Sequence, residues 1–283
     1  MIDRVAKNEI AAKFHYRARK SLGQHFLTAR GVVLDIIKAA NIKIGETVLE
    51  IGPGKGILTE ALLEAGAKVI AIEKDARMIG VLKEKFAPEI KNGHLNLVCG
   101  DILELRPSDY QLKTTDYKLI SNIPYYITGE ILRKFIGGKV KPSRAVLLVQ
   151  KEVAERIVAK TDKPFDSAQG KESILSISIK IYGTPKYVEK VPAGCFSPVP
   201  KVDSAILLIE NIRNPFLSEQ EENNFFTALK SGFAHKRKLL AGNLSSFFGR
   251  EKIGVFFARC GIGEKARAEN LSVKDWLCLA RGI

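Results

Sequence analysis

Cysteine is scarce in this chain, and long apolar runs are absent. The four cysteines, Cys99, Cys195, Cys260 and Cys278, form no C-x-x-C pair and have no histidine at metal-ligand spacing. We therefore expect neither a disulfide framework nor a zinc or other metal site. No uninterrupted apolar run reaches about 18 residues, so no membrane span is expected. The N-terminus lacks the apolar segment of a secretory signal, which makes the cytoplasm the expected location.

Acidic residues are too few to balance the basic ones. The 283 residues include 31 Asp and Glu against 45 Lys and Arg, which gives a formal net charge of +14. A chain this basic usually meets a polyanion, because phosphates attract Lys and Arg over long range. A merely basic soluble protein is the alternative, and charge alone does not exclude it. The length suits one large domain and one small one.

Four apolar segments that read as buried strands each end at a glycine or a polar residue. The expected strands cover residues 47–51, 68–72, 96–99 and 118–121. They lead into Gly52, Glu73, Asp101 and Asn122, in that order. Parallel strands joined by helices collect their carboxyl ends at one edge of the sheet, where ligands bind. We therefore expect these four residues to share one site.

The turn after the first strand is glycine-rich and opens a helix. Gly52, Gly54 and Gly56 follow a G-x-G-x-G spacing, which differs from the G-x-G-x-x-G of dinucleotide sites. Glycines there let the backbone approach a ligand in front of the helix N-terminus. Glu73, at the end of the next strand, can accept both ribose hydroxyls of a nucleoside. Together they predict a nucleoside-binding crevice.

The stretch Ser121-Asn122-Ile123-Pro124-Tyr125-Tyr126 follows the fourth strand. The Asn122 carboxamide offers an acceptor oxygen, and Pro124 stiffens the turn because its φ is fixed. Tyr125 supplies a flat face on which a base can stack. To bind an exocyclic amino group on an aromatic ring, a site needs acceptors for its two N–H bonds and a flat surface for the ring, and this stretch offers both. A plain strand-to-loop turn would be the better interpretation without the glycine loop upstream.

The second half of the chain is expected to complete the sheet and then turn helical. Further strands are predicted at 145–149, 174–182 and 205–209, the last two pairing as an antiparallel edge. Residues 160–172 are polar and read as a loop. Beyond Pro215 the pattern is helical, and two capping boxes are predicted, Ser218-x-x-Glu221 and a weaker Ser272-x-x-Asp275. Lys236, Arg237 and Lys238 form a basic cluster that either contacts RNA phosphates or is a solvated face.

The ordered motifs resemble those of the ribosomal RNA adenine dimethyltransferases. The matching segments are Lys20-Ser-Leu-Gly-Gln-His-Phe-Leu27, Val48-Leu-Glu-Ile-Gly-Pro-Gly54, Asn122-Ile-Pro-Tyr125, Val149-Gln-Lys-Glu-Val-Ala-Glu-Arg156, Phe196-x-Pro-x-Pro-Lys-Val-Asp-Ser204, Lys236-Arg-Lys-Leu and Arg267-Ala-Glu-Asn-Leu-Ser272. The resemblance implies a Rossmann-like class I methyltransferase domain at 1–211, with a mainly parallel seven-stranded sheet. It also implies a small all-α RNA-binding domain at 212–283.

The same resemblance implies the reaction and the residues that perform it. The expected reaction is the S-adenosyl-L-methionine-dependent N6,N6-dimethylation of two adjacent adenosines near the 3′ end of small-subunit ribosomal RNA. The implied cofactor contacts are His25, Leu27, Gly52, Gly54, Glu73, Asp101 and Asn122. Glu73 would bind the ribose hydroxyls, Asp101 the adenine amino group of the cofactor, and Tyr125 and Phe196 would sandwich the target base. Asn122 and a carbonyl near Pro124 would accept from the target amino group.

Three alternatives remain at this point. A large-subunit methyltransferase of the macrolide-resistance type shares the catalytic motifs, but the C-terminal segments argue against it. A DNA adenine-N6 methyltransferase would carry Asp-Pro-Pro-Tyr in place of Asn122 to Tyr125. A non-catalytic RNA-binding assembly factor on the same fold would not need an intact Asn-Ile-Pro-Tyr. We expect a monomer that works on the small ribosomal subunit or its precursor.

Overall fold

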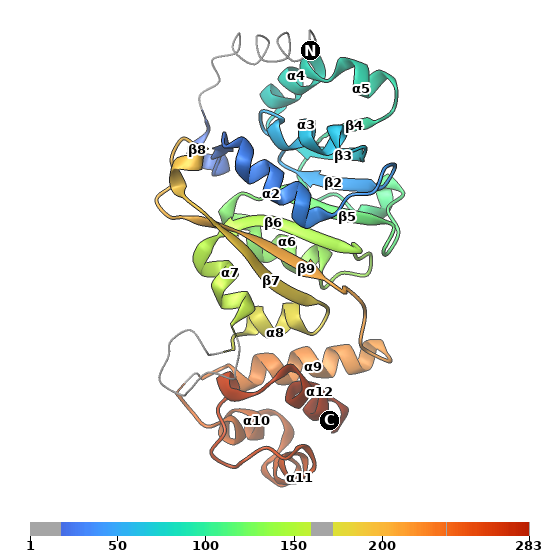
Figure 1. The fold of residues 1–283 in the computed structure, drawn as a ribbon. Coiled ribbons are helices and arrows are strands. Elements are labelled where there is room, and N and C mark those ends of the chain that lie inside the picture. Colours follow the sequence, from blue (N-terminus) through green and yellow to red (C-terminus); the bar gives the residue numbers. More distant parts are fainter. Residues whose placement is uncertain (1–17, 160–171, 236, 283) are drawn as a thin grey trace. The chain divides into compact units, whose positions relative to one another are not determined.

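The computed structural model describes residues 18–159, 172–235 and 237–282. The chain divides into two compact units, which Figure 1 colours along the sequence. The first unit contains Met1–Ala154 and Thr184–Ile212, and the second contains Glu155–Gly183 and Arg213–Ile283. The predicted domains, 1–211 and 212–283, differ from this division in two places: Glu155–Gly183 groups with the second unit, and Ile212 groups with the first.

The first unit is built on a seven-stranded sheet of order β4-β3-β2-β5-β6-β9-β7. The strands are β2 (Thr47–Ile51), β3 (Lys68–Glu73), β4 (Leu95–Cys99), β5 (Tyr117–Asn122), β6 (Arg144–Gln150), β7 (Thr184–Val191) and β9 (Ser204–Glu210). Strands β2 to β6 are parallel, while β9 runs antiparallel to both β6 and β7. The mainly parallel, Rossmann-like sheet predicted from the sequence is confirmed.

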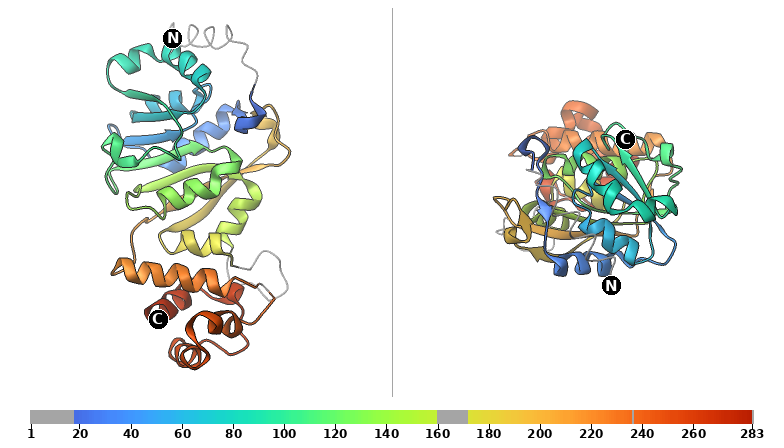
Figure 2. Two further views of the ribbon diagram at one scale, coloured as in Figure 1. Left: turned by 180° about the vertical axis from the view of Figure 1, so that it is seen from behind. Right: turned by 90° about the horizontal axis from the view of Figure 1, so that it is seen from above.

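Helices precede, connect and follow the parallel strands and cover both faces of the sheet (Figures 1 and 2). They are α2 (Arg30–Ala40), α3 (Ile57–Glu64), α4 (Ala76–Lys85), α5 (Ala87–Lys91), α6 (Thr128–Phe135) and α7 (Lys151–Val158). Val33 and Ile36 of α2 belong to the same buried cluster as Ile120 and Val146 of the central strands. These strands are buried on both faces, which is why their sequences read as continuous apolar runs.

The order in which the chain adds strands reverses between β2 and β5. From β2 the chain proceeds to β3 and β4 on one side, and then crosses to β5 on the other. The parallel ladder between β2 and β5 ends at the pair Leu49 and Leu119, before either strand has ended. Beyond it the Ser121 hydroxyl donates to the Ile51 carbonyl at 2.5 Å and keeps the two strand ends together. A crevice at such a switch point is the usual ligand site of open α/β sheets.

Residues 174–180 form a helix, so the strand predicted at 174–182 is wrong. Helix α8 (Ile174–Lys180) begins after Ser173, whose hydroxyl accepts from the Ser176 N–H, while the Ser176 hydroxyl accepts from the Ser173 N–H. This double cap outweighs the β-propensity of four isoleucines in nine residues. The antiparallel edge does exist, but β9 pairs with β7. The loop predicted at 160–172 lies outside the described residues except for Glu172.

The second unit is helical in the part that the structure describes. It contains α8, α9 (Glu219–Gly232), α10 (Leu240–Phe248), α11 (Arg250–Cys260) and α12 (Val273–Gly282). Ser218 caps α9 by accepting from the Glu221 N–H, and the Glu221 carboxylate accepts from Leu217 instead of returning to Ser218. The pair Ser272 and Asp275 forms the complete reciprocal box at α12.

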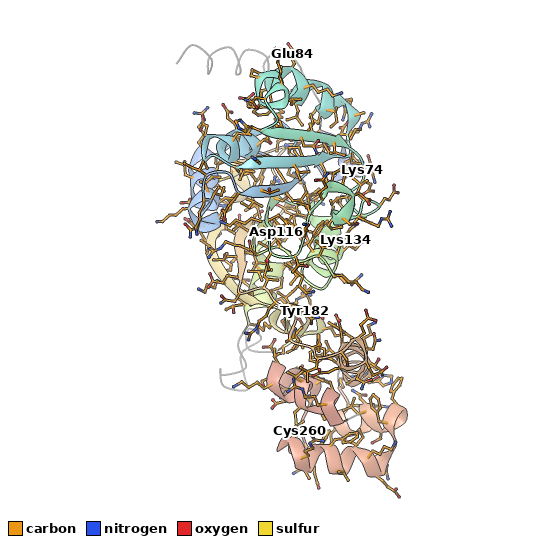
Figure 3. The ribbon with its side chains drawn as sticks, turned by 90° about the vertical axis from the view of Figure 1, so that its right-hand side faces the viewer. Lys74, Glu84, Asp116, Lys134, Tyr182 and Cys260 are labelled. Atoms are coloured by element: carbon orange, nitrogen blue, oxygen red, sulfur yellow. A yellow bond between two sulfur atoms is a disulfide. The ribbon has the colours of Figure 1, made fainter. Side chains whose placement is uncertain are left out.

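The expectation that the chain has no disulfide is wrong. Cys260 at the end of α11 and Cys278 in α12 are joined by a disulfide, with their Cα atoms 5.9 Å apart (Figure 3). The spacing of 18 residues matches no local motif, and only the packing of the two helices brings the sulfur atoms together. Cys99 and Cys195 are free thiols. Among the described residues, no helix is long and apolar enough to cross a membrane.

Glu50, in β2 beneath the glycine loop, makes the stability of the first unit depend on pH. Its side chain is 1% exposed and accepts a hydrogen bond from the Thr59 hydroxyl of α3 at 2.7 Å. Burial raises the pKa of Glu50 to about 8 from its usual 4.5. The folded state then holds a proton that the unfolded chain releases. The stabilisation is complete below pH 4.5 and is lost as pH rises toward 8.

Glu50→Gln should remove this dependence because glutamine keeps the shape and cannot ionise. Between pH 5 and 7 the wild type should lose about 1.4 kcal/mol of unfolding free energy per pH unit relative to the variant. Urea denaturation at several pH values measures the difference. Glu84→Gln, on an exposed position of α4, is the matched control and should follow the wild type. Parallel pH profiles of Glu50→Gln and wild type would contradict the assignment.

Candidate active site

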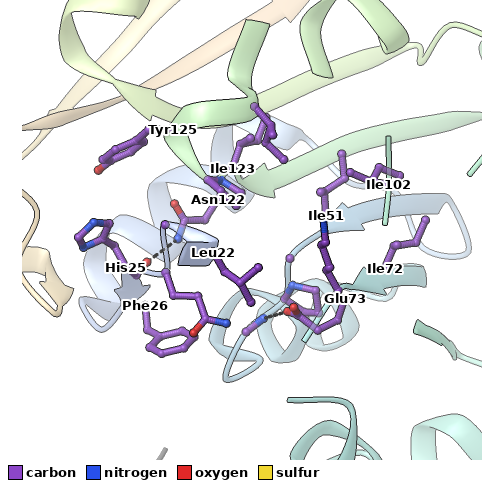
Figure 4. Close-up of a pocket in the computed structure, with 18 of the residues that line it drawn as sticks. Leu22, His25, Phe26, Ile51, Ile72, Glu73, Ile102, Asn122, Ile123 and Tyr125 are labelled. Carbon is purple, nitrogen blue, oxygen red and sulfur yellow. Dashed lines mark hydrogen bonds between the residues drawn. The ribbon is translucent and has the colours of Figure 1, made fainter. Parts of the chain in front are cut away.

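The crevice at the carboxyl ends of the strands is lined by five segments of the chain (Figure 4). They cover residues 22–27, 51–58, 72–74, 100–103 and 122–127, without Gly56. All the cofactor contacts predicted from the sequence line it: His25, Leu27, Gly52, Gly54, Glu73, Asp101 and Asn122. Pro124 and Tyr125 also line it, while Phe196 does not. The structure therefore brings together every predicted residue of the first unit except one.

The glycine loop has the backbone geometry that its spacing predicts. Gly52 and Gly54 have φ values of 64° and 56°, which side chains rarely adopt. A Cβ atom on Gly54 would also lie 2.9 Å from the Phe26 ring, so only glycine fits. The backbone of Gly52 and Gly54 therefore lines the crevice without side chains, with Phe26 next to Gly54 and Pro124 next to Gly52.

The Glu73 carboxylate is fixed by backbone donors from two directions. Its Oε2 accepts from the Gly54 N–H at 3.1 Å, and its Oε1 accepts from the Asp75 N–H at 2.9 Å. The side chain is 6% exposed, and burial raises the pKa of Glu73 despite these hydrogen bonds. Each oxygen keeps a further lone pair, so the carboxylate can still accept hydroxyl groups from a ligand.

Gln24 ties the N-terminal segment to the helix that follows β3. Its Nε2 donates to Asp75 Oδ2 at 3.0 Å, and its Oε1 accepts from the Arg19 N–H at 2.8 Å. Asp75 caps α4 and pairs with the Arg77 guanidinium, which holds the pKa of that carboxyl well below its usual range. The Gln24 contact thereby places His25 and Phe26 over the crevice.

The side-chain amide of Asn122 is oriented by a hydrogen bond from its nitrogen, so that its oxygen is directed toward the crevice. Its Nδ2 donates to the backbone carbonyl of His25 at 3.2 Å. In Figure 4 the carboxamide oxygen faces the space beside Tyr125. Within the described residues no partner for this oxygen is found. A hydrogen bond to His25 therefore sets which way the amide is turned, and it leaves an acceptor toward the crevice.

Tyr125 stands beside this acceptor with its hydroxyl anchored. The hydroxyl lies 2.7 Å from the Oγ of Ser204, which is fully buried at the start of β9. Burial raises the pKa of the Tyr125 hydroxyl, so it remains protonated. The His25 ring lies nearly parallel to that of Tyr125, with centroids 5.8 Å apart and planes at 21°. The His25 Nδ1 lies 2.8 Å from the Pro198 carbonyl.

Phe196 pairs with Leu27 beside the crevice but does not line it. It forms the short strand β8 (Phe196–Ser197) against β1 (Phe26–Leu27), and it is only 2% exposed. Its ring belongs to the buried cluster that includes Leu27 and Val33. A sandwich of the target base between Tyr125 and Phe196 needs a bound base, so this role of Phe196 stays a prediction. The aromatic ring parallel to Tyr125 is His25.

Asp101 is surrounded by two lysines at the far end of the crevice. Its Oδ2 accepts from Lys74 Nζ at 2.6 Å, and its Oδ1 accepts from the Leu103 N–H at 3.0 Å. Partial burial alone would raise the pKa of Asp101, but these hydrogen bonds lower it, so the carboxylate is ionised. Lys134 of α6 donates to the carbonyls of Ile102 and Leu103. Figure 3 places Lys74 and Lys134 at the same edge of the sheet.

The predicted basic cluster lies in the turn between α9 and α10 of the second unit. Arg237 and Lys238 are exposed there, while Lys236 lies outside the described residues. The side chain of Asn243, 2% exposed, stabilises this turn. Its Nδ2 donates to the carbonyls of Gly232 at 2.6 Å and His235 at 3.1 Å. Arg237 and Lys238 are thus exposed on a turn that the hydrogen bonds of Asn243 stabilise.

Sequence reasoning missed several residues that position the site. Gln24 and Ser204 lie inside motifs whose neighbours were assigned, so their polar side chains were a usable signal. Lys74 follows Glu73 directly and could have been suspected for the same reason. Lys134 carries no such signal, because its contact depends on how α6 packs beside the loop after β4.

Comparison with known proteins gives a match over nearly the whole chain. Residues 15–283 match the family described as ribosomal RNA adenine dimethylase. A ribosomal RNA small subunit methyltransferase A of Dehalococcoides mccartyi is 42% identical over 277 residues, covering 96% of this chain and 91% of the relative.

Two solved structures extend the likeness to three dimensions. A dimethyladenosine transferase from Plasmodium falciparum has a TM-score of 0.74 and 30% identity, covering 90% of this chain and 96% of that one. The 23S rRNA methyltransferase ErmE has a TM-score of 0.71 and 26% identity, covering 91% and 98%. With its strand-end residues in one crevice and a family match across nearly its whole length, the chain belongs to the ribosomal RNA adenine dimethylase family.

Proposed function

We propose that this chain transfers methyl groups from S-adenosyl-L-methionine to N6 of two adjacent adenosines near the 3′ end of small-subunit ribosomal RNA. The observation that carries the proposal is the fixed amide of Asn122, whose oxygen faces the crevice beside Pro124 and Tyr125. A monomer acting in the cytoplasm, as expected from the sequence, is part of the same proposal.

The residues of the crevice fit the cofactor. Glu73 has lone pairs for two ribose hydroxyls, and Asp101 is an ionised acceptor for the adenine amino group. Gly52 and Gly54 leave room for the amino-acid portion, with His25 and Leu27 on the other wall. When bound, the cofactor supplies an electrophilic methyl group on a sulfonium centre. Carboxylates around the crevice suit that positive charge.

The chain's own residues contribute positioning and electrostatics. The lone pair of adenine N6 is delocalised into the ring, which makes the nitrogen a poor nucleophile. Asn122 Oδ1 and a backbone carbonyl beside Pro124 accept its two N–H bonds and favour a pyramidal nitrogen. Tyr125, anchored on Ser204, gives the extruded base a face for stacking. No strong general base is required, because the proton leaves after methyl transfer.

The choice of the small subunit rests on similarity across the whole chain. The relative named small subunit methyltransferase A is 42% identical, against 26% for the 23S rRNA enzyme. Both have the same fold, so the fold does not separate the two substrates. The C-terminal segments Lys236-Arg-Lys-Leu and Arg267 to Ser272 support the small-subunit assignment.

Mass spectrometry of ribosomal RNA tests the proposal. Small ribosomal subunits that lack the modification should gain N6,N6-dimethyladenosine on incubation with the protein and S-adenosyl-L-methionine. Large subunits and duplex DNA, treated in parallel, should gain nothing. Methylation confined to large-subunit RNA would favour the resistance-type activity, and binding without methylation would favour an assembly factor.

Asn122→Ala should separate catalysis from cofactor binding. The substitution removes the acceptor for the target amino group and leaves Glu73 and Asp101 in place. Single-turnover methylation should fall by roughly 10²–10³, the size typical of one lost preorganised polar contact. Cofactor affinity, measured by titration of the same variant, should change much less. A variant that binds cofactor poorly but methylates normally at saturation would show that Asn122 serves binding alone.

The basic turn between α9 and α10 should contribute phosphate contacts. Replacing Lys236, Arg237 and Lys238 by Ala should weaken RNA binding and flatten its salt dependence by about one log–log unit per lost contact. The double variant Arg250→Ala/Lys252→Ala, on exposed positions of α11, is the charge control. If both variants shift the salt slope by the same amount per charge, the effect is non-specific and the cluster is a solvated face.

A further inference from the structure

A lysine from the helix after the catalytic turn holds the loop that carries Asp101. Lys134 lies in the last turn of α6 and donates from Nζ to the Ile102 carbonyl at 2.7 Å and to the Leu103 carbonyl at 2.8 Å. Both loop residues line the crevice. The contact joins two parts of the site that are 31 and 32 residues apart in the sequence.

One rigid peptide unit connects this lysine to the Asp101 carboxylate. The carbonyl of Ile102 and the N–H of Leu103 belong to the same peptide, which is planar and trans, so they point in opposite directions. Lys134 takes the carbonyl, and Asp101 Oδ1 accepts from the N–H at 3.0 Å. A charged donor on one side of a peptide strengthens the hydrogen bond on its other side. The position of Lys134 is thereby transmitted to the carboxylate.

The helix that carries Lys134 is anchored in the core by three buried side chains. Ile131, Leu132 and Phe135 of α6 are fully buried, with 0% exposure. The helix starts at Thr128, directly after the turn that contains Asn122 and Tyr125. The lysine itself is partly buried, and burial lowers the pKa of its ammonium group. A desolvated cation is costly to keep unless it is hydrogen-bonded, as here to two carbonyls.

The other lysine on Asp101 is a weaker candidate for this task. Lys74 contacts Oδ2 directly at 2.6 Å, but its side chain is 54% exposed. An exposed ion pair contributes little and is screened by salt.

We propose that Lys134 is a positioning residue for the cofactor's adenine: through the 102–103 peptide it aims the Asp101 carboxylate into the crevice and links it to the catalytic turn. The inference rests on the proposed role of Asp101 as the acceptor for the adenine amino group. It adds a residue that contacts neither cofactor nor RNA.

Binding of S-adenosylhomocysteine, measured by calorimetry without RNA, tests this inference. Lys134→Met keeps the length of the side chain and removes the donors, and it should weaken binding about 10-fold. Lys134→Arg can still donate to both carbonyls and should recover most of the affinity. Arg133→Met, exposed on the same helix, removes the same charge and should bind like the wild type.

A ligand that lacks the amino group distinguishes positioning from general support. The analogue of S-adenosylhomocysteine with hydrogen in place of the 6-amino group has nothing for Asp101 to accept. Wild type and Lys134→Met should bind this analogue equally. Equal weakening of both ligands, or unchanged binding of S-adenosylhomocysteine by Lys134→Met, overturns the inference. Faster amide hydrogen exchange at residues 101–105 in Lys134→Met is expected, and unchanged exchange would also contradict it.

Asp101→Ala separates a failure of this inference from a failure of the proposed function, because alanine has no acceptor for the adenine amino group. If Asp101→Ala binds S-adenosylhomocysteine like the wild type, the assignment of Asp101 fails and the role of Lys134 fails with it. If Asp101→Ala is weak while Lys134→Met binds normally, only the role of Lys134 is lost. In the Asp101→Ala background, Lys134→Met should cause little further loss, because the two residues act through one contact.

Discussion

The early end of the ladder between β2 and β5 is the constraint on which the site depends. The ladder stops at Leu49 and Leu119, and beyond it the Ser121 hydroxyl donates to the Ile51 carbonyl and keeps the two strand ends together. The crevice at these strand ends is lined by the glycine loop after β2 and by the Asn122 turn at the end of β5. Because neighbouring strands end at the same edge, Glu73 and Asp101 arrive beside them without further adjustment.

The orientation of the Asn122 amide determines that the crevice offers a hydrogen-bond acceptor at this position. Asparagine has a donor end and an acceptor end of nearly equal size, and only its surroundings decide which one faces a ligand. The His25 carbonyl takes the donor end. That carbonyl is in place because Gln24 binds Asp75 and because β1 pairs with β8. The segment from Gln24 to Leu27 therefore orients the Asn122 amide through its backbone, in addition to the side-chain contacts expected for it.

The sequence predicted the residues of the site better than their contacts. Strand ends are readable because apolar runs stop at Gly52, Glu73, Asp101 and Asn122, and topology alone then brings them together. The stacking role of Phe196 stays a prediction, because a motif does not reveal how much of an aromatic ring the core covers, and this ring is only 2% exposed.

The errors elsewhere have two origins, one local and one in long-range packing. The strand predicted from Ile174 to Tyr182 follows the strand propensity of isoleucine, while the two serines that cap α8 are a local signal for a helix. The Cys260–Cys278 disulfide and the Lys134 contacts join residues that only helix packing brings together. Local patterns cannot reveal such pairs, whatever their importance for the site.

The exchange of the Asn122 side-chain amide protons tests the central claim most directly. In the cofactor-free protein, nitrogen-15 spectra of asparagine side chains identify Asn122 by the signal that Asn122→Ala removes. One of its two amide protons should exchange with solvent about 10-fold more slowly than those of an exposed asparagine, because it is bonded to the His25 carbonyl. Exchange of both protons at the rate of an exposed asparagine would contradict the account, since the amide would then be free to turn.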